Sequence, residues 1–186
     1  MIGFMRMLLT VLAVVAAVVP GAGPRPAVAA SAAEIDRGVD ATLQTLYQEI
    51  PAARAVGDVA EGILVFPNVV KAGFIIGGQY GEGALRQNGL TTGYYNTLAA
   101  SYGLQAGAQS FGYALFFMGH EALAYLDRSG GWELGVGPSI VVLDEGAARN
   151  LTTTTAKSDI YAFVLSQRGL MAGLGLQGSK ISRINR

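Results

Sequence analysis

The chain is poor in the side chains on which most enzymes depend. Its 186 residues include no cysteine and a single histidine, His120. The lack of cysteine excludes a disulfide framework, a thiol nucleophile and a cysteine-based metal site. His120-Glu121 begins like the zinc motif H-E-x-x-H, but the second histidine is missing. We therefore expect no enzymatic activity, no catalytic residue, no metal and no cofactor.

A complete nucleotide motif is also lacking. The stretch GLGLQGSK at residues 173–180 matches the dinucleotide fingerprint G-x-G-x-x-G. That fingerprint has to open a helix and be followed by an acidic residue about 20 positions further on. Only eight residues follow Gly178, and none is acidic. A phosphate-binding loop needs lysine directly after its last glycine, whereas Ser179 separates Gly178 from Lys180. We interpret the match as a coincidence and expect no bound nucleotide.

The chain has no apolar run as long as the roughly 20 residues that span a membrane comfortably. Residues 7–19 are almost entirely apolar, and Ala27-Val28-Ala29 has the small-x-small pattern of a signal peptidase site. These features predict a signal peptide at residues 1–29, cut after Ala29 or Ala30, and a mature domain at residues 30–186. The protein would then be exported, to a periplasm or to the medium. An uncleaved membrane anchor is the alternative.

The first part of the mature domain has helical patterns. Ser31 and Glu34 are spaced as in a capping box, and apolar residues recur at helical spacing as far as Ile50. We expect a helix over residues 32–50. Pro51 ends it and can begin a second, shorter helix that continues to about Glu61.

Beyond residue 61 the patterns are those of strands. Residues 63–66 are an apolar run that we expect to end at Pro67, and alternation begins near residue 72. Asn88-Gly89 predicts a tight turn, residues 134–138 form a weaker strand, and a further strand begins at residue 157 or 158. Many of the 26 glycines lie within strands, which indicates strong bends. The predicted fold class is α+β, with N-terminal helices packed on a strongly curved, Gly-rich antiparallel sheet that is open or closed like a barrel.

Charge is scarce and unevenly distributed. Without residues 1–29, which include Arg6 and Arg25, the chain has 11 basic and 13 acidic side chains, and this slight negative excess argues against nucleic-acid binding. No acid follows Asp159, however, so the last 27 residues are a basic segment. Hydroxyls and cations can together hold a phosphate. The candidate lipid headgroup-binding residues are therefore Lys157, Arg168, Lys180, Arg183, Arg186, Thr152, Thr153, Thr154 and Thr155.

The last three cations cannot all lie on one face of a strand. Lys180 and Arg186 have one parity and Arg183 has the other. They can act together only if the chain end leaves the sheet as a flexible or helical tail. The polar side of the first helix is net acidic, so we expect that helix to pack on the sheet and the basic segment to face lipid.

Six segments of the mature domain carry a resemblance to a known family. They are GILVFPNVVKAGFIIGGQYGEG (62–83), GYYN (93–96), SYGLQAGAQSFGYALFFM (101–118), GWELGVGPSIVVLDEG (131–146), TTTT (152–155) and GLMAGLGLQGSKISRI (169–184). In this order they resemble the SYLF family of lipid-binding proteins, also called the Ysc84 domain family. The resemblance implies an α+β domain that binds membrane lipids, including phosphoinositides; some eukaryotic members also bind actin. The form resembles the exported bacterial type, many of which are lipoproteins, but the lipid-carrying cysteine is absent.

Together the residues and the resemblance predict a non-enzymatic protein that binds anionic phospholipid or phosphoinositide headgroups at a membrane surface. It would be peripherally associated with that membrane. Two alternatives stay open: a small outer-membrane β-barrel, because alternating strands and a signal peptide suit one, and a structural or stress-associated envelope protein without a specific ligand.

Overall fold

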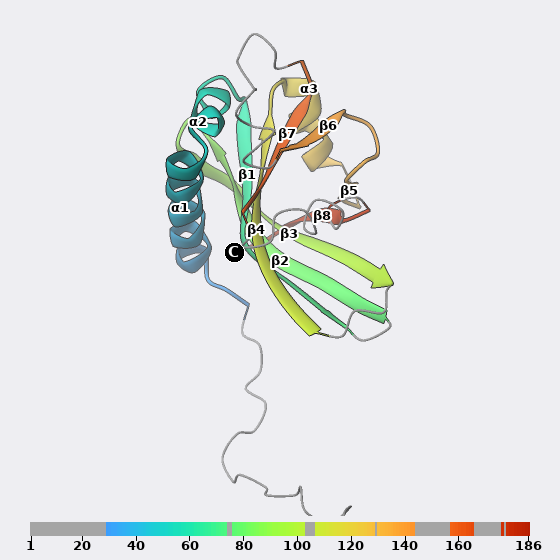
Figure 1. Ribbon diagram of the computed structural model, residues 1–186. Helices are drawn as coiled ribbons and strands as arrows, with labels where there is room; N and C mark the ends of the chain where they lie inside the picture. Colours follow the sequence, from blue (N-terminus) through green and yellow to red (C-terminus); the bar gives the residue numbers. More distant parts are fainter. Residues whose placement is uncertain are drawn as a thin grey trace, which may run out of the picture.

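A computed structural model describes residues 29–73, 76–102, 107–128, 130–143, 157–165, 176 and 178–186. Two N-terminal helices lie against a strongly curled sheet that forms a half-barrel (Figure 1). The predicted α+β class is confirmed. The elements are α1 (Ala32–Glu49), α2 (Pro51–Gly57), β1 (Gly62–Gly73), β2 (Ile76–Gln87), β3 (Leu90–Tyr102), β4 (Gly107–Phe117), α3 (His120–Leu123), η1 (Ala124–Asp127), β5 (Trp132–Glu133), β6 (Ile140–Leu143), β7 (Ile160–Leu165) and β8 (Lys180–Ile184).

The sheet has the strand order β5-β8-β3-β2-β1-β4-β7-β6. All of its pairings are antiparallel except that of β6 with β7, which is parallel, so the sheet is mixed rather than purely antiparallel. Strands β1 to β4 are the long ones, and in Figure 1 they continue past the helices toward the lower right. This extension leaves part of the sheet without a helical cover.

Helix α1 begins with the expected capping box. The Ser31 hydroxyl accepts a hydrogen bond from the Glu34 N–H, and the Glu34 carboxylate accepts from the Ser31 N–H at 2.8 Å. The Ser31 hydroxyl, followed by the Ser31 N–H, lowers the pKa of Glu34. Helix α2 starts at Pro51 as expected but ends at Gly57, four residues before Glu61. The helix ends early because the Glu61 N–H donates a hydrogen bond to Phe117 O at the end of β4, which places Glu61 next to the first residue of β1.

Strand β1 does not end at Pro67, so that prediction was wrong. The strand runs through Pro67 at a bulge, where its register shifts against both β2 and β4. Proline fits there because a bulge leaves a residue outside the ladder and so needs no N–H. The bulge also explains two strand glycines. A Cβ on Gly83 would overlap Val65 O, and one on Gly112 would lie 2.9 Å from Pro67 O.

The sheet has two apolar cores, one on each face. We call the face that carries α1 and α2 the outer face; its core includes Val39, Leu46, Ala84 and Phe116. The opposite, inner face packs Leu64, Tyr113 and Phe117 against α3, η1 and Trp132 of β5. The long strands are therefore buried on both faces where helices cover them, which explains continuous apolar runs such as residues 63–66.

The remaining sequence predictions have mixed outcomes. Asn88-Gly89 forms the expected turn, with positive φ at both residues, and β7 begins at Ile160. Residues 134–138 are not a strand, because Gly135 and Gly137 adopt positive φ and the Trp132 indole N–H donates to Val136 O. The chain end does not leave the sheet: residues 180–184 form β8, between β3 and β5. Within the described residues, no helix has the length and apolarity needed to cross a membrane.

Candidate functional site

An open groove lies on the outer face beside the N-terminal end of α1, where the long strands continue beyond the helix. Its volume is about 1090 Å³. One wall is the start of α1 and the residues before it, Ala29 to Gly38, and the floor is formed by β1, β2 and β3. The groove exists because the strands are longer than the helix that covers them (Figure 1).

The floor contains a row of side chains that crosses four strands. Val70 pairs with Tyr80, Tyr80 with Leu98, and Leu98 with Lys180. Directly paired residues point to the same face of a sheet, so all four lie on the outer face. We call Val70, Tyr80, Leu98 and Lys180 the cross-strand row. It spans three strand spacings, or about 14 Å.

Three members of the cross-strand row are large apolar side chains that face solvent. Val70 is 44% exposed, Tyr80 is 46% exposed and Leu98 is 55% exposed. Burial of such side chains is what normally stabilises a sheet face. Their contiguous exposure makes this the candidate binding surface, since an exposed apolar patch usually marks an interaction site.

Lys180 adds a positive charge to the row, and on its other side it pairs with Glu133 of β5. Its side chain is exposed, and no carboxylate in the described part of the chain lies within ion-pair distance of it. Lys180 is therefore available to an anionic ligand that also contacts Leu98.

Glu82 forms a polar rim beside this apolar floor. It accepts a hydrogen bond from the Tyr80 hydroxyl at 2.6 Å and from the Ala30 N–H at 3.2 Å, and it forms an ion pair with Arg186. The Glu82 side chain is only 9% exposed. Burial, and then the hydrogen bond to Glu82, raises the pKa of Tyr80. The contact with Glu82 places Arg186 at the groove, on the same side as Lys180.

Arg183 lies on the other side of the sheet. It pairs with Asp127 at 3.3 Å, donates to Thr92 O at 3.0 Å and lies over the Tyr95 ring, whose body belongs to the inner core. The parity argument was correct: Lys180 and Arg186 share one side, and Arg183 has the other. The expected tail that would unite all three is wrong, because Ile181 is buried in the inner core and holds this segment in the sheet.

The other candidate residues do not join this group in the structure. Lys157 is exposed just before β7, and four strands separate β7 from β8 in the sheet. Arg168 and Thr152 to Thr155 lie outside the described residues. His120 is exposed at the start of α3. Within the described part of the chain, no three carboxylate or imidazole groups cluster as a metal site would require.

Comparison with protein families gives a match over the second half of the chain. The family model Ysc84, described as "Las17-binding protein actin regulator", matches residues 98–185. The Ysc84 (SYLF) resemblance is thus confirmed for residues 98–185 of the chain. The match begins at Leu98 and includes β4 to β8 with Lys180, whereas Val70, Tyr80 and Glu82 precede it. No curated protein matches the chain.

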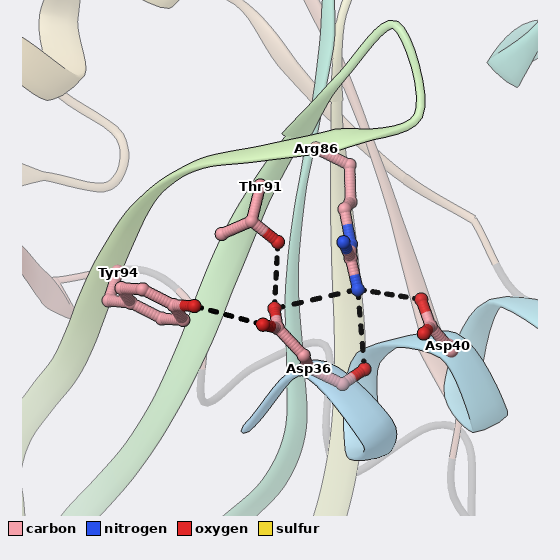
Figure 2. A network of polar contacts seen from close by, with 5 residues as sticks. All are labelled: Asp36, Asp40, Arg86, Thr91 and Tyr94. Atoms are coloured by element: carbon pink, nitrogen blue, oxygen red, sulfur yellow. Dashed lines mark hydrogen bonds and ion pairs between the residues drawn. The ribbon is translucent and has the colours of Figure 1, made fainter. Parts of the chain in front are cut away.

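The wall of the groove is held in place by an ion-pair network at the start of α1. Figure 2 shows Arg86 of β2 pointing at α1, where its Nη2 lies 2.6 Å from Asp40 Oδ1 and 3.5 Å from Asp36 Oδ1. Asp36 also accepts hydrogen bonds from the Thr91 and Tyr94 hydroxyls of β3, at 2.7 and 2.9 Å. Burial, and then the bond to Asp36, raises the pKa of Tyr94. The network thus ties the helix to two strands at the point where the groove begins.

The sequence analysis missed the apolar part of the site. One signal was present: Val69 and Val70 are consecutive apolar residues in a strand, so one of them had to face away from the inner core. Val69 is fully buried and Val70 is exposed. The sequence does not show that α1 stops short of Val70, which is what leaves that side chain uncovered.

Proposed function

We propose that this chain is a non-enzymatic lipid-binding protein that lays the cross-strand row against an anionic phospholipid. The observation that carries the proposal is the order of side chains within the row: three exposed apolar residues are followed by a lysine that forms no ion pair with any described residue. The Ysc84 family is known for lipid and actin-related binding, which supports lipid as the partner.

The chemistry of the row suits the interface of a bilayer. Val70, Tyr80 and Leu98 would enter the apolar edge of the lipid, and Lys180 would stay at the headgroup. Each of the three apolar side chains is about half exposed, so its burial contributes about 1 kcal/mol. A lysine near an anionic surface adds about 1 kcal/mol. A total of about 4 kcal/mol corresponds to weak, reversible binding.

Arg186 is the second headgroup candidate in this proposal. Its guanidinium presents five N–H donors, and the contact with Glu82 uses only part of them. A phosphate could therefore bind beside Glu82 without displacing Arg186. Phosphoinositide is one of the anionic headgroups that these two cations would accept; Lys157, Arg168 and Thr152 to Thr155 would belong to a separate site.

The place of action follows from the same proposal. With residues 1–29 removed as a signal peptide, the domain would meet lipid as an exported protein, in a periplasm or outside the cell. The association would be peripheral, because the row provides contact with one face of a membrane only.

Liposome flotation of residues 30–186 tests this function. We expect binding to vesicles of mixed phosphatidylglycerol and phosphatidylcholine, and less binding to phosphatidylcholine alone. Lys180→Gln and Leu98→Gln should each weaken binding about fivefold, because each side chain contributes about 1 kcal/mol. High salt should reduce the Lys180 contribution.

The matched control is Arg183→Gln. It removes the same kind of charge from the same strand, but on the side away from the row. Binding by this variant, and by His120→Ala, should stay within about twofold of the unaltered protein, since each residue lies outside the row. If Arg183→Gln weakens binding as much as Lys180→Gln, or if both are without effect, the cross-strand row is not the lipid surface.

A further inference from the structure

The backbone nitrogen of Ala30 lies against a shielded carboxylate. Its N–H donates to Glu82 Oε2 at 3.2 Å. The other oxygen, Oε1, is occupied by the Tyr80 hydroxyl and by Arg186. Glu82 is on the middle of β2 and is 9% exposed, so this contact joins the residue before α1 to the wall of the groove.

Ala30 is also the residue that follows the small-x-small pattern Ala27-Val28-Ala29. We propose that the Ala29–Ala30 bond is a processing site and that Glu82 is the receptor for the new N-terminus. A signal peptidase would hydrolyse this peptide bond. The hydroxyl of a water molecule goes to the Ala29 carbonyl carbon, and its proton goes to the Ala30 nitrogen. The free amine then takes a second proton from solvent near neutral pH and becomes an α-ammonium group.

Processing replaces a hydrogen bond between a neutral N–H and a carboxylate with an ion pair. The backbone N–H already donates to a charged acceptor, and the ammonium group adds the attraction between two opposite charges. The shielding of Glu82 reduces screening by water and salt, so the gain exceeds that of a fully exposed pair. The mature N-terminus therefore stabilises the start of α1 on the sheet.

The same step changes the charge of the groove wall. Glu82 and Arg186 cancel each other before processing. The α-ammonium group adds one positive charge beside Tyr80, a member of the cross-strand row. Maturation thus favours an anionic ligand at the groove; this last consequence rests on the proposed lipid-binding function, whereas the Ala30–Glu82 ion pair does not.

The structure distinguishes between the two cuts that the sequence allows. A cut after Ala30 would place the ammonium group on Ser31, whose N–H lies 2.8 Å from Glu34 Oε2. Glu34 is exposed, so that ion pair would be weak. Ser31 is also the N-cap of α1, where a positive charge is unfavourable beside the positive end of the helix dipole. The cut after Ala29 gives the ammonium group the shielded partner Glu82 and places the charge one residue further from the helix.

Melting temperatures of chains with defined first residues test the proposal. One chain would begin at Ala30, released from a fusion that leaves no extra residue, and a second would begin at Ala29. The extra residue moves the ammonium group away by about 3.8 Å, the spacing of consecutive Cα atoms. We expect the chain that begins at Ala30 to melt about 2–4 °C higher, as one partly buried ion pair does in a chain of this size.

Glu82→Gln and Glu34→Gln separate the two possible receptors. Each variant would be made in both chains, so that any effect of the substitution on folding itself cancels in the comparison. The difference between the chains should fall below about 1 °C with Glu82→Gln and persist with Glu34→Gln. Equal melting temperatures of the two unaltered chains, or a difference that survives Glu82→Gln, would overturn the proposal.

The second measurement is the mass of the mature protein from its native host. The proposal requires Ala30 as the first residue, and a mature form that begins at Ser31 or Met1 contradicts it. Neither measurement involves lipid. Loss of flotation with the melting difference intact would therefore refute the proposed function and leave this inference standing.

Discussion

The network around Asp36 allows a prediction in which the longer of two ion pairs matters more than the shorter. Arg86 lies 2.6 Å from Asp40 but 3.5 Å from Asp36 (Figure 2). The two carboxylates differ in surroundings, however. The Asp40 side chain is 70% exposed, whereas that of Asp36 is 31% exposed and also accepts hydrogen bonds from Thr91 and Tyr94. We therefore expect Asp36→Asn to destabilise the fold and Asp40→Asn to leave it almost unchanged.

The magnitudes follow from exposure and from the number of bonds. Hydrogen bonds to a charged group contribute about 1.5–3 kcal/mol when buried. Asp36 is partly exposed and its amide replacement keeps some hydrogen bonds, so we expect a loss of about 2 kcal/mol. An exposed pair contributes at most about 0.5–1 kcal/mol, which is the upper bound for Asp40→Asn. In a chain of this size these values correspond to melting temperatures lower by about 4–8 °C for Asp36→Asn and by at most about 4 °C for Asp40→Asn.

Urea unfolding followed by circular dichroism and by the fluorescence of Trp132 would measure both variants. Trp132 is the single tryptophan and is 2% exposed, so its emission reports loss of the inner core. Circular dichroism reports α1, and coincident transitions would confirm that both parts unfold together. The reasoning fails if Asp40→Asn costs as much as Asp36→Asn, because distance rather than burial would then determine the strength of this network.

Two further predictions concern the interior of the sheet. Gly83→Ala should destabilise the fold by about 3 kcal/mol or more, or prevent folding, because the new Cβ would overlap Val65 O in the backbone of β1. The control is Gly119→Ala, where a Cβ meets nothing within 4 Å and the expected loss is less than about 1 kcal/mol. Urea unfolding compares the two variants. Burial raises the pKa of Tyr113 well above that of a free tyrosine, so the unfolded chain releases this proton first and stability should fall as the pH rises above about 10. Tyr113→Phe should remove that part of the alkaline loss and be neutral or slightly stabilising near pH 7, since no well-aligned hydrogen-bond partner for the buried hydroxyl is found among the described residues. An alkaline stability curve that is identical for the two proteins would contradict the role assigned to Tyr113.

The local chemistry of the chain determines several elements without help from tertiary structure. Ser31 and Glu34 cap the start of α1, Pro51 separates α1 from α2, and Asn88-Gly89 forms the turn that connects β2 to β3. Each of these depends on hydrogen bonds or φ values within four residues, so the sequence contains all the necessary information. The α+β class follows from the change in periodicity after residue 61 in the same way.

Predictions failed where distant segments decide the outcome. Pro67 remains inside β1 because both neighbouring strands shift register there, and Gly83 and Gly112 make room for the bulge. The chain end was expected to leave the sheet as a basic tail, but residues 180–184 pair with β3 and β5 and form strand β8. A short basic segment has no periodicity that reveals such pairing.

The candidate site also has one part that the sequence predicts and one part that only the tertiary structure brings together. Parity alone separated Arg183 from Lys180 and Arg186, because side chains alternate along any strand. Only the tertiary structure brings Lys180 beside Leu98, Tyr80 and Val70, since register links residues up to 110 positions apart in the chain. It also decides that this row is exposed, because the N-terminal end of α1 lies beside Val70 and Leu98 without covering them. The sequence by itself determined which residues are apolar or charged and which neighbours in a strand share a face. Burial and cross-strand contact depend instead on the length of each element relative to the elements packed on it. These relative lengths are a property of the whole fold.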